Sequence, residues 1–329
     1  DTTGFYPIMH DTVSVKDSTA VMHFTNKAGA RFHMNTLDFD LSVQHRYCEF
    51  WQENTLKSFN ELLPALAGEL KKDDWVLGAQ TDFTFCDDGF EGWSLQANYQ
   101  KSFPALELDF KTAYHTNEPP KMLNSYRSSY YAWENNFDNT SLWYGSAELN
   151  HKYGKVSASF TDIANYVYFD REGFPAQHQK SFQFARVKLE PKVQWYDFTF
   201  NNTLLYQRVI GKDLLRLPEF MSRHSLFYSF YLIRGELQTQ VGARMTYHSS
   251  FYGHQYYPAT QAFALQNEQK VGNYPYLDVF ANFYIKRTRF FFRYSHVNAL
   301  LNDNAYFLMP SYPMQDNTFQ FGVSWMFYD

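Results

Sequence analysis

The sequence predicts an all-β protein, a transmembrane antiparallel up-and-down β-barrel of about 14 to 16 strands. Three observations support this fold class. The last stretch alternates strictly between two kinds of side chain, 20% of the 329 residues are aromatic, and no uninterrupted apolar run approaches about 18 residues. Because a membrane-crossing helix needs such a run, strands are the only elements of this sequence expected to cross a membrane.

The C-terminal stretch, residues 317–329, is the clearest strand. One parity is apolar and mostly aromatic, and most of the other parity is polar or small. A soluble edge strand with such a face would aggregate, whereas lipid solvates an aromatic face and barrel closure pairs both strand edges. We therefore expect the following side chains to face lipid: Phe319, Phe321, Val323, Trp325 and Phe327.

The composition favours a barrel over a soluble core. The chain has 33 Phe and 26 Tyr, yet its mean hydropathy is −0.49 and 19% of its residues are charged. Aromatic girdles at two membrane interfaces, with polar residues facing a lumen, would give this combination. The alternative, a soluble sandwich, would need one core to hold aromatic residues from every strand. Residues at strand ends expected in the girdles are Trp75, Trp143, Trp195, Tyr196, Tyr274, Tyr276 and Trp325.

Alternating runs separated by turn residues recur along the whole chain. Pro64 and Gly68 weaken a helical alternative for residues 56–70. Residues 226–233 are apolar on both parities, so their facing stays open, and one or two more strands fit between Val13 and Met34. The expected strands are 37–44, 61–70, 75–85, 93–100, 106–115, 143–149, 156–160, 185–190, 196–206, 226–233, 237–248, 277–285, 289–295 and 319–327.

Short and long connections alternate, which orients the predicted barrel. We expect the short turns on the periplasmic side and the long loops outside the cell. A barrel of this kind also needs an even number of strands, both termini in the periplasm, and pairing of its first strand with its last. The short turns are residues 71–74, 152–155, 234–235 and 286–287, and the long loops follow Tyr114, Tyr206, Tyr247 and Ala299.

No linker or composition shift divides the sequence, which predicts one barrel domain over residues 31–329. Residues 1–30 are interpreted as an N-terminal segment that is either periplasmic or the first strand. The chain opens at Asp1 without a basic region or an apolar segment, so we expect a secretory signal to have been removed or to lie outside this sequence.

The C-terminal region also resembles a known family. Its loop Tyr312-Pro313-Met314-Gln315-Asp316 is followed by an aromatic-x-Phe-Gly-x-Ser-Trp strand at residues 319–325. This pair resembles the closing hairpin of the putative porins of Bacteroidota. Residues 62–103, which include Lys71-Lys72-Asp73-Asp74-Trp75, are similar to the same family.

The resemblance covers most of the chain from about Leu37 onward. It implies an outer-membrane barrel that passes solutes, and it supplies no catalytic motif. Family members are often longer, so a larger barrel with this chain as its C-terminal part stays an alternative. One departure is that Asp329 follows Tyr328, whereas many outer-membrane barrels end on an aromatic residue.

The parity opposite the aromatic one carries the charges that would line a lumen. Earlier strands are acidic and later strands basic, so one hypothesis is a transverse electric field across the lumen. The alternative is that charges pair locally, such as Arg186 with Glu190 or Lys111 with Asp109, and fill a plugged interior. The predicted lumen residues are Arg186, Lys188, Arg244, Arg289 and Arg293 on the basic side, and Asp38, Asp40, Asp82, Glu107 and Asp109 on the acidic side.

No G-x-S-x-G, H-E-x-x-H, P-loop or dinucleotide fingerprint is present, so we expect no enzyme and no cofactor. Cys48 and Cys86 are expected on the outer rim with one strand between them, so a disulfide would require the loops to lean together. Ser295 and His296 are adjacent and would point to opposite faces. The histidines lack metal spacing and are interpreted as lone interior residues, with no metal site: His45, His115, His151, His248 and His296.

These observations predict a porin-like channel for passive passage of small hydrophilic solutes across a bacterial outer membrane. The alternative is a plugged accessory barrel that docks on other outer-membrane proteins through the Tyr-rich loop 249–273. A third interpretation, a secreted all-β binding domain, would be soluble without detergent. Expected partners are outer-membrane lipid and small solutes, and the net charge of −5 argues against nucleic acid.

Overall fold

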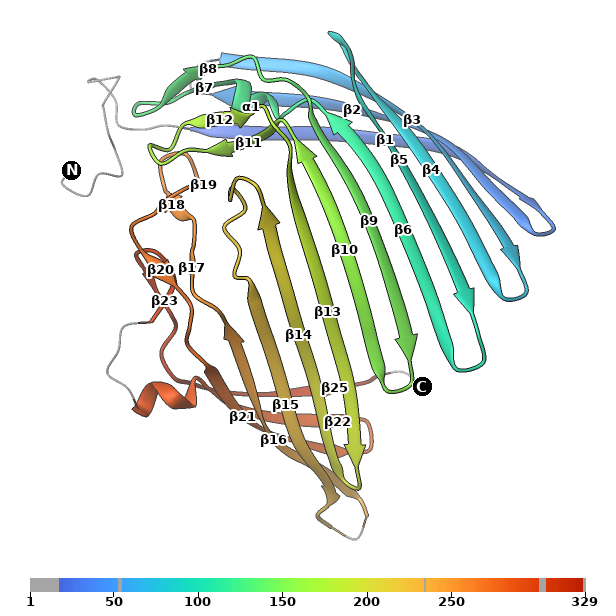
Figure 1. The fold of residues 1–329 in the computed structure, drawn as a ribbon, viewed down its shortest axis with the longest axis vertical. Coiled ribbons are helices and arrows are strands. Elements are labelled where there is room, and N and C mark those ends of the chain that lie inside the picture. The colour runs from blue at the N-terminus through green and yellow to red at the C-terminus, as the bar shows by residue number, and fades with distance from the viewer. Residues whose placement is uncertain (1–17, 53–54, 234, 302–305, 328–329) are drawn as a thin grey trace.

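The computed structural model describes residues 18–52, 55–233, 235–301 and 306–327. Its main element is one antiparallel sheet of 15 strands in which each strand pairs with the next strand of the sheet along the chain (Figure 1). The predicted antiparallel up-and-down fold is therefore confirmed. The strands are β1 Thr19–Met34, β2 Leu37–Gln52, β3 Thr55–Lys72, β4 Trp75–Cys86, β5 Gly89–Ser102, β6 Leu106–Asn117, β9 Thr140–His151, β10 Gly154–Ala164, β13 Phe182–Trp195, β14 Phe198–Ile210, β15 Phe220–Tyr231, β16 Leu237–His248, β21 Tyr276–Ile285, β22 Thr288–Ser295 and β25 Thr318–Trp325.

Every expected strand overlaps one of these, and most are longer than the alternating pattern indicates. Residues 56–70 lie in β3, so the helical alternative is wrong there. Of the stretch between Val13 and Met34, the structure describes residues 18–34, and these contain one strand, β1. The expected strand 196–206 begins too early, because Tyr196 is a turn residue with φ of 51° between β13 and β14.

Short turns gather at one end of the sheet and long loops at the other. Asn35, Tyr196 and Lys286 each have φ near 50° at a short turn, which is the left-handed backbone conformation that tight hairpin turns favour. The turns expected at 71–74, 152–155 and 286–287 are confirmed, and Arg234 of the fourth lies outside the described residues. The periplasmic placement of this end stays a prediction.

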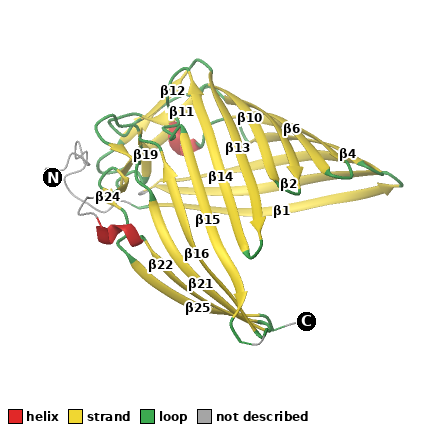
Figure 2. Ribbon diagram, turned by 60° about the horizontal axis from the view of Figure 1, so that its bottom comes forward, coloured by secondary structure: helices red, strands yellow, loops and turns green. Residues whose placement is uncertain are grey.

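The described sheet has two free edges, β1 and β25 (Figure 2). Among the described residues β1 pairs only with β2, and β25 pairs only with β22. The count of strands is odd, so β1 begins at the long-loop end and β25 finishes at the short-turn end. The expected even count and the expected pairing of first with last strand are therefore not met by the described strands.

The expected N-terminal segment falls partly outside the described residues, which begin at residue 18. Its remaining part lies in β1, which runs through residue 30 without interruption to Met34. The division at residues 30 and 31 thus falls inside one strand.

The two faces of the sheet differ as the alternating pattern predicts. In β25 the apolar side chains are highly exposed, at 60% for Phe319, 72% for Phe321 and 61% for Trp325. The register joins this face to the apolar face of β22, since Phe321 lies opposite Phe292. Apolar surface of this extent is unstable in water and stable against lipid.

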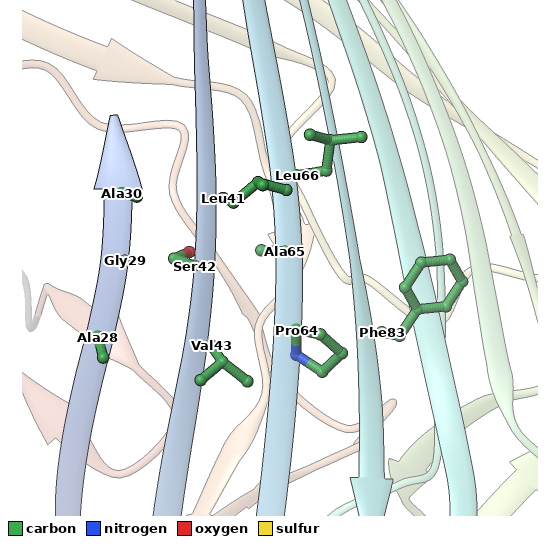
Figure 3. Close-up of a pocket in the computed structure, with 10 residues that line it drawn as sticks. All are labelled: Ala28, Gly29, Ala30, Leu41, Ser42, Val43, Pro64, Ala65, Leu66 and Phe83. Carbon is green, nitrogen blue, oxygen red and sulfur yellow. The ribbon is translucent and has the colours of Figure 1, made fainter. Parts of the chain in front are cut away.

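A shallow hollow interrupts the apolar face over β1 to β4 (Figure 3). Its floor consists of small side chains from neighbouring strands, including Ala28, Ala30 and Pro64, and larger ones such as Leu41 and Phe83 border it. Val43 lies directly opposite both Ala28 and Pro64 in the register, so these residues share one face. The hollow therefore belongs to the surface expected to meet lipid.

No helix in the described part of the chain is long and apolar enough to span a membrane.

The opposite roles of the two faces predict unequal effects of the same charge on adjacent residues of β5. Leu95 and Gln96 are both exposed but point to the apolar and the polar face respectively. Leu95→Arg should lower the free energy of unfolding by about 2 to 4 kcal/mol, because it places a charge near the bilayer centre. Gln96→Arg should be nearly neutral. Urea unfolding in lipid vesicles measures both, and equal losses would contradict the assignment of faces.

Candidate functional site

On β1 to β6, the polar face carries charges that are paired locally. Arg31 Nε lies 2.7 Å from Asp40 Oδ1, and Lys71 Nζ lies 3.8 Å from Asp38 Oδ2. Lys111 Nζ lies 3.6 Å from Asp109 Oδ2, which confirms the pair considered from the sequence. Cation and carboxylate therefore largely neutralise one another on this part of the sheet.

The remaining acidic residues predicted for the lumen also have polar partners. The Ser94 hydroxyl donates to Asp82 at 2.5 Å, and the amide of Gln100 donates to Glu107. Polar side chains from β1 to β5, Gln96 and Asn98 among them, line a hollow of about 330 Å³ on this face. The structure thus favours local pairing over an unpaired acidic wall.

The basic residues on the later strands behave differently. Arg244 on β16 lies opposite Asp278 on β21, and Arg293 on β22 lies opposite Phe280 on β21. Among the described residues, no ion pair involves Arg244, Arg289 or Arg293. The structure therefore brings these three predicted residues onto one polar face, and none of them forms an ion pair there among the described residues.

Arg186 and Lys188 lie further away, on β13. Lys188 Nζ is 2.8 Å from Glu190, so the partner of Glu190 is Lys188 and not Arg186 as the local-pairing alternative suggested. The reason is geometric: residues two apart on a strand project from the same face and are nearest neighbours there. The Arg186 guanidinium instead lies 5.1 Å from the ring centre of Phe184.

Sequence reasoning missed Arg223 of β15 as a member of this face. Its register partner is Thr246, two residues from Arg244 on β16, so Arg223 and Arg244 project from the same side. The apolar run 226–233 had hidden the facing of this strand. The alternation of its earlier half, read together with the clear pattern of β16, would have revealed it.

The long loops pack into one body at the long-loop end of the sheet, here called the cap. Its largest sheet combines β12 Pro175–His178, β11 Tyr166–Phe169, β19 Ala262–Ala264 and β18 Gln255–Tyr257. A parallel pairing of Phe169 with Ala264 joins two different loops. Further cap elements are α1 Lys121–Asn124, β7 Ser125–Arg127, β8 Ala132–Glu134, β17 Phe251–Tyr252, β20 Lys270–Val271, η1 Val297–Leu301, β23 Phe307–Met309 and β24 Tyr312–Pro313.

Aromatic side chains form the core of the cap. Tyr131 and Ala264 are fully buried there, and Tyr126 and Tyr257 pack with them. A second cluster contains Phe182, Leu214 and Leu265. The loop 249–273, expected as a docking surface, therefore contributes side chains to the interior of the cap.

One part of the cap lies against the polar face of the sheet. Lys121 Nζ in α1 is 2.8 Å from Glu91 of β5 and 2.9 Å from Glu118. Burial opposes the charge of Lys121, but the hydrogen bonds that Lys121 donates to both glutamates, together with their negative charges, outweigh burial and raise the pKa of this lysine. Beneath α1 a cavity of about 720 Å³ is lined by Arg46, Glu61 and other residues of β1 to β3.

The cysteines lie where the sequence placed them, toward the long-loop end of β2 and β4. Both are buried and free. Cys48 lies opposite Phe59 and Cys86 lies opposite Glu61, so β3 separates them. The disulfide is not formed in this arrangement.

The predicted girdle residues lie toward the two ends of the sheet. Two of them, Tyr274 and Tyr276, also contact His296. Tyr274 and His296 are joined by a hydrogen bond of 2.9 Å, and the ring of Tyr276 stacks on His296 at 4.7 Å. His296 is 2% exposed, and its Nδ1 lies 2.9 Å from the carbonyl oxygen of Gln315. Tyr274 and Tyr276 thus belong to a buried polar network at the foot of the cap.

Among the other histidines, the Nε2 atom of His45 lies 3.1 Å from Asn60 Oδ1, and that of His115 lies 2.8 Å from Asn117 Nδ2. In the described ranges, no three His, Cys, Asp or Glu residues are arranged to hold a metal ion.

Comparison with known proteins gives a family and a fold. The family model described as a putative porin matches residues 1–329. No curated protein matches the chain.

Solved outer-membrane β-barrels share the fold. The siderophore receptor PirA from Acinetobacter baumannii has a TM-score of 0.66 and 9% identity over 93% of this chain and 55% of its own. The FrpB iron transporter from Neisseria meningitidis (F5-1 variant) has a TM-score of 0.69 and 10% identity over 94% and 56%. A mutant of the ferric enterobactin receptor PfeA from Pseudomonas aeruginosa has a TM-score of 0.69 and 9% identity over 93% and 54%. The chain spans about half the length of these structures.

The packed core of the cap predicts that one truncation will open it. Tyr131→Ala should remove about 3 to 5 kcal/mol of local packing, because a fully buried aromatic side chain is replaced by a cavity. Limited trypsin digestion should then cleave after Arg127 while the sheet stays intact. Tyr153→Ala, at a short turn where the side chain is 65% exposed, is the matched control and should leave the cap resistant.

Local stability of the cap should also depend on pH through His254, which lies between β17 and β18. Burial lowers the pKa of its imidazole below the ordinary 6.5, and Arg216 acts in the same direction, while the Leu214 backbone and Asp213 partly oppose both. Below about pH 6.5 the opened loop takes up a proton before the packed loop does, so the cap should lose stability as pH falls. Above that pH His254 is neutral in both the packed and the opened loop, so the cap keeps its full stability.

Hydrogen exchange of residues 249–273 at pH 5.5 and 7.5, corrected for intrinsic rates, measures this effect. His254→Gln should reduce the pH dependence of protection. His178 of β12, whose pKa burial also lowers, remains in both proteins and sets the residual dependence. An undiminished dependence in the variant would exclude His254 as its source.

Proposed function

Because the chain belongs to the putative porin family, we propose that it forms an outer-membrane channel for passive passage of small hydrophilic solutes. The observation that carries the proposal is the separation of faces along the sheet. Exposed apolar side chains such as Phe321 occupy one face, and charged and hydrogen-bonded ones such as Asp40 and Arg293 occupy the other. A lumen lined in this way solvates polar solutes and gives apolar ones no advantage.

The family match places the protein in the outer membrane. The resemblance of its closing hairpin to Bacteroidota porins supports extending the proposal to a Gram-negative outer membrane of that group. Siderophore receptors and an iron transporter share the fold at 9% to 10% identity, so the proposed solute class rests on the polar face and not on those proteins. We propose no catalytic activity.

A second candidate, a plugged accessory barrel, is favoured by a specific observation. The loop around α1 is fixed to the polar face by the ion pair of Lys121 with Glu91. A loop held there would narrow the long-loop end of any lumen. A closed structural subunit could keep this loop in place, whereas in a channel solutes would have to pass beside it.

Conductance separates the two candidates. The full chain, reconstituted in a planar bilayer, should give stepwise current increments, and liposomes that contain it should admit small sugars. Asn98→Trp should lower the single-channel conductance because Asn98 shares the polar face of β5 with Gln96. Ala97→Trp, one residue away on the apolar face, is the matched control and should conduct like the parent protein. A closed trace from correctly folded protein would favour the accessory role.

A further inference from the structure

We propose that Arg223, Arg244 and Arg293 form an oxyanion-binding site on the polar face of the later strands. Its ligand would be the carboxylate or phosphate group of a small solute. The inference rests on the proposed function and deepens it, because it names the chemical class of solute that this wall would favour.

The register places the three arginines on one face of β15, β16 and β22, with β21 between the last two. Ser225, two residues from Arg223, lies opposite Arg244, and Arg244 lies opposite Asp278. Phe280, two residues from Asp278 on the same face, lies opposite Arg293. Arg223 and Arg293 are both near enough to act electrostatically on Arg244, and Asp278 acts on it in the opposite direction. The positive charges are therefore concentrated on one short arc of β15, β16 and β22.

The protein offsets this concentration only in part, because Asp278 is the carboxylate that acts on Arg244 and it forms no ion pair there. No ion pair among the described residues involves Arg223, Arg244 or Arg293, whereas Arg31 and Arg46 on the first strands each contact a carboxylate within 3 Å. Like charges without counter-charges repel, and an anion that binds between them removes part of that cost. Binding of an anion to the arc is therefore more favourable than binding to β1 to β6, where the positive charges are already paired with carboxylates.

Among the described residues, the acid opposite Arg244 on this arc is Asp278, and it already accepts a hydrogen bond from the backbone. Asp278 is 7% exposed, and its Oδ1 accepts a hydrogen bond of 3.2 Å from the backbone N–H of His296. It lies opposite Arg244 in the register, yet the two form no ion pair. Asp278 therefore offsets one charge at most, and three arginines against one carboxylate leave a net positive charge on the arc for an external anion.

Aromatic side chains form the floor of the arc. The Arg244 guanidinium lies 5.9 Å from the ring centre of Phe280, and the rings of Phe227 and Phe280 are 6.5 Å apart. Gly242 lies between these two rings in the register, and a Cβ there would come within 2.6 Å of Phe227 Cβ. The glycine therefore allows a continuous apolar floor, which excludes water beneath the charges and strengthens them.

Arg293 is also oriented for binding. Its Nε and Nη2 both donate to Oε1 of Gln320 on β25, the former at 3.0 Å. These bonds use one edge of the planar guanidinium and fix its plane. Because a guanidinium pairs with carboxylate or phosphate through two parallel N–H bonds, a fixed plane favours oxyanions over spherical chloride.

Two measurements on the full chain test the site. The first is ion selectivity, from reversal potentials across a KCl gradient in a planar bilayer at about 0.1 M, where screening acts over about 10 Å. Arg244→Gln with Arg293→Gln should lower the anion-to-cation permeability ratio on the order of threefold. Lys72→Gln with Lys152→Gln removes the same charge near the short turns and should leave the ratio unchanged.

The second measurement does not require conduction. Inorganic phosphate is titrated into the detergent-solubilised protein and followed by phosphorus NMR. The double glutamine variant should raise the dissociation constant of phosphate by about tenfold or more, because charge-assisted hydrogen bonds are lost. Arg244→Lys with Arg293→Lys should keep the permeability ratio and weaken phosphate binding, because it keeps charge and loses the paired N–H bonds.

The outcomes distinguish the two proposals. Conduction with selectivity and phosphate binding unchanged in the double glutamine variant would overturn the site and leave the channel. A closed trace with phosphate binding that depends on the two arginines would overturn the channel and support the site. Unaltered circular dichroism and unaltered heat-dependent gel migration establish that each variant is folded.

Discussion

The register of the sheet is the constraint on which the rest of this structure depends. Side chains on a strand alternate with a period of two, so a slip by one residue would exchange the two faces completely. Across β15, β16, β21 and β22 the register keeps every arginine of the arc on the same side as Phe227 and Phe280. The apolar surface, the ion pairs of the first strands and the oxyanion arc all follow from this single alignment.

The two halves of the polar face differ in how their charged side chains are paired. On β1 to β6 oppositely charged residues sit on adjacent strands and within reach, as with Arg31 and Asp40. On β15, β16 and β22 the arginines form no ion pair among the described residues, and the guanidinium of Arg244 lies against the ring of Phe280. A ring supports a cation weakly and does not neutralise it, so the field of the second half extends into solvent.

Alternation in the sequence was sufficient to predict the strands, because every second side chain of a strand points to the same face and so has the same chemical character. It failed at Tyr196, which lies with positive φ in the tight turn between β13 and β14, because aromatic residues stand on both sides of this turn. It also missed Arg223 beside the ambiguous run 226–233. The cap could not be predicted at all, since pairings such as Phe169 with Ala264 join separate loops and leave no periodic signal.

The same parallel pairing bears on the order in which the molecule assembles. Each strand of the sheet pairs with its neighbour in the chain, so the sheet has low contact order and grows hairpin by hairpin. The cap is different, because Tyr131, Phe169 and Tyr257 belong to three loops that meet only after β9 through β16 are aligned. Because closing these long loops has a high entropic cost, we expect the core of the cap to form after the strands are aligned, so that burial of Tyr131 would report a chain whose strands have reached their final register.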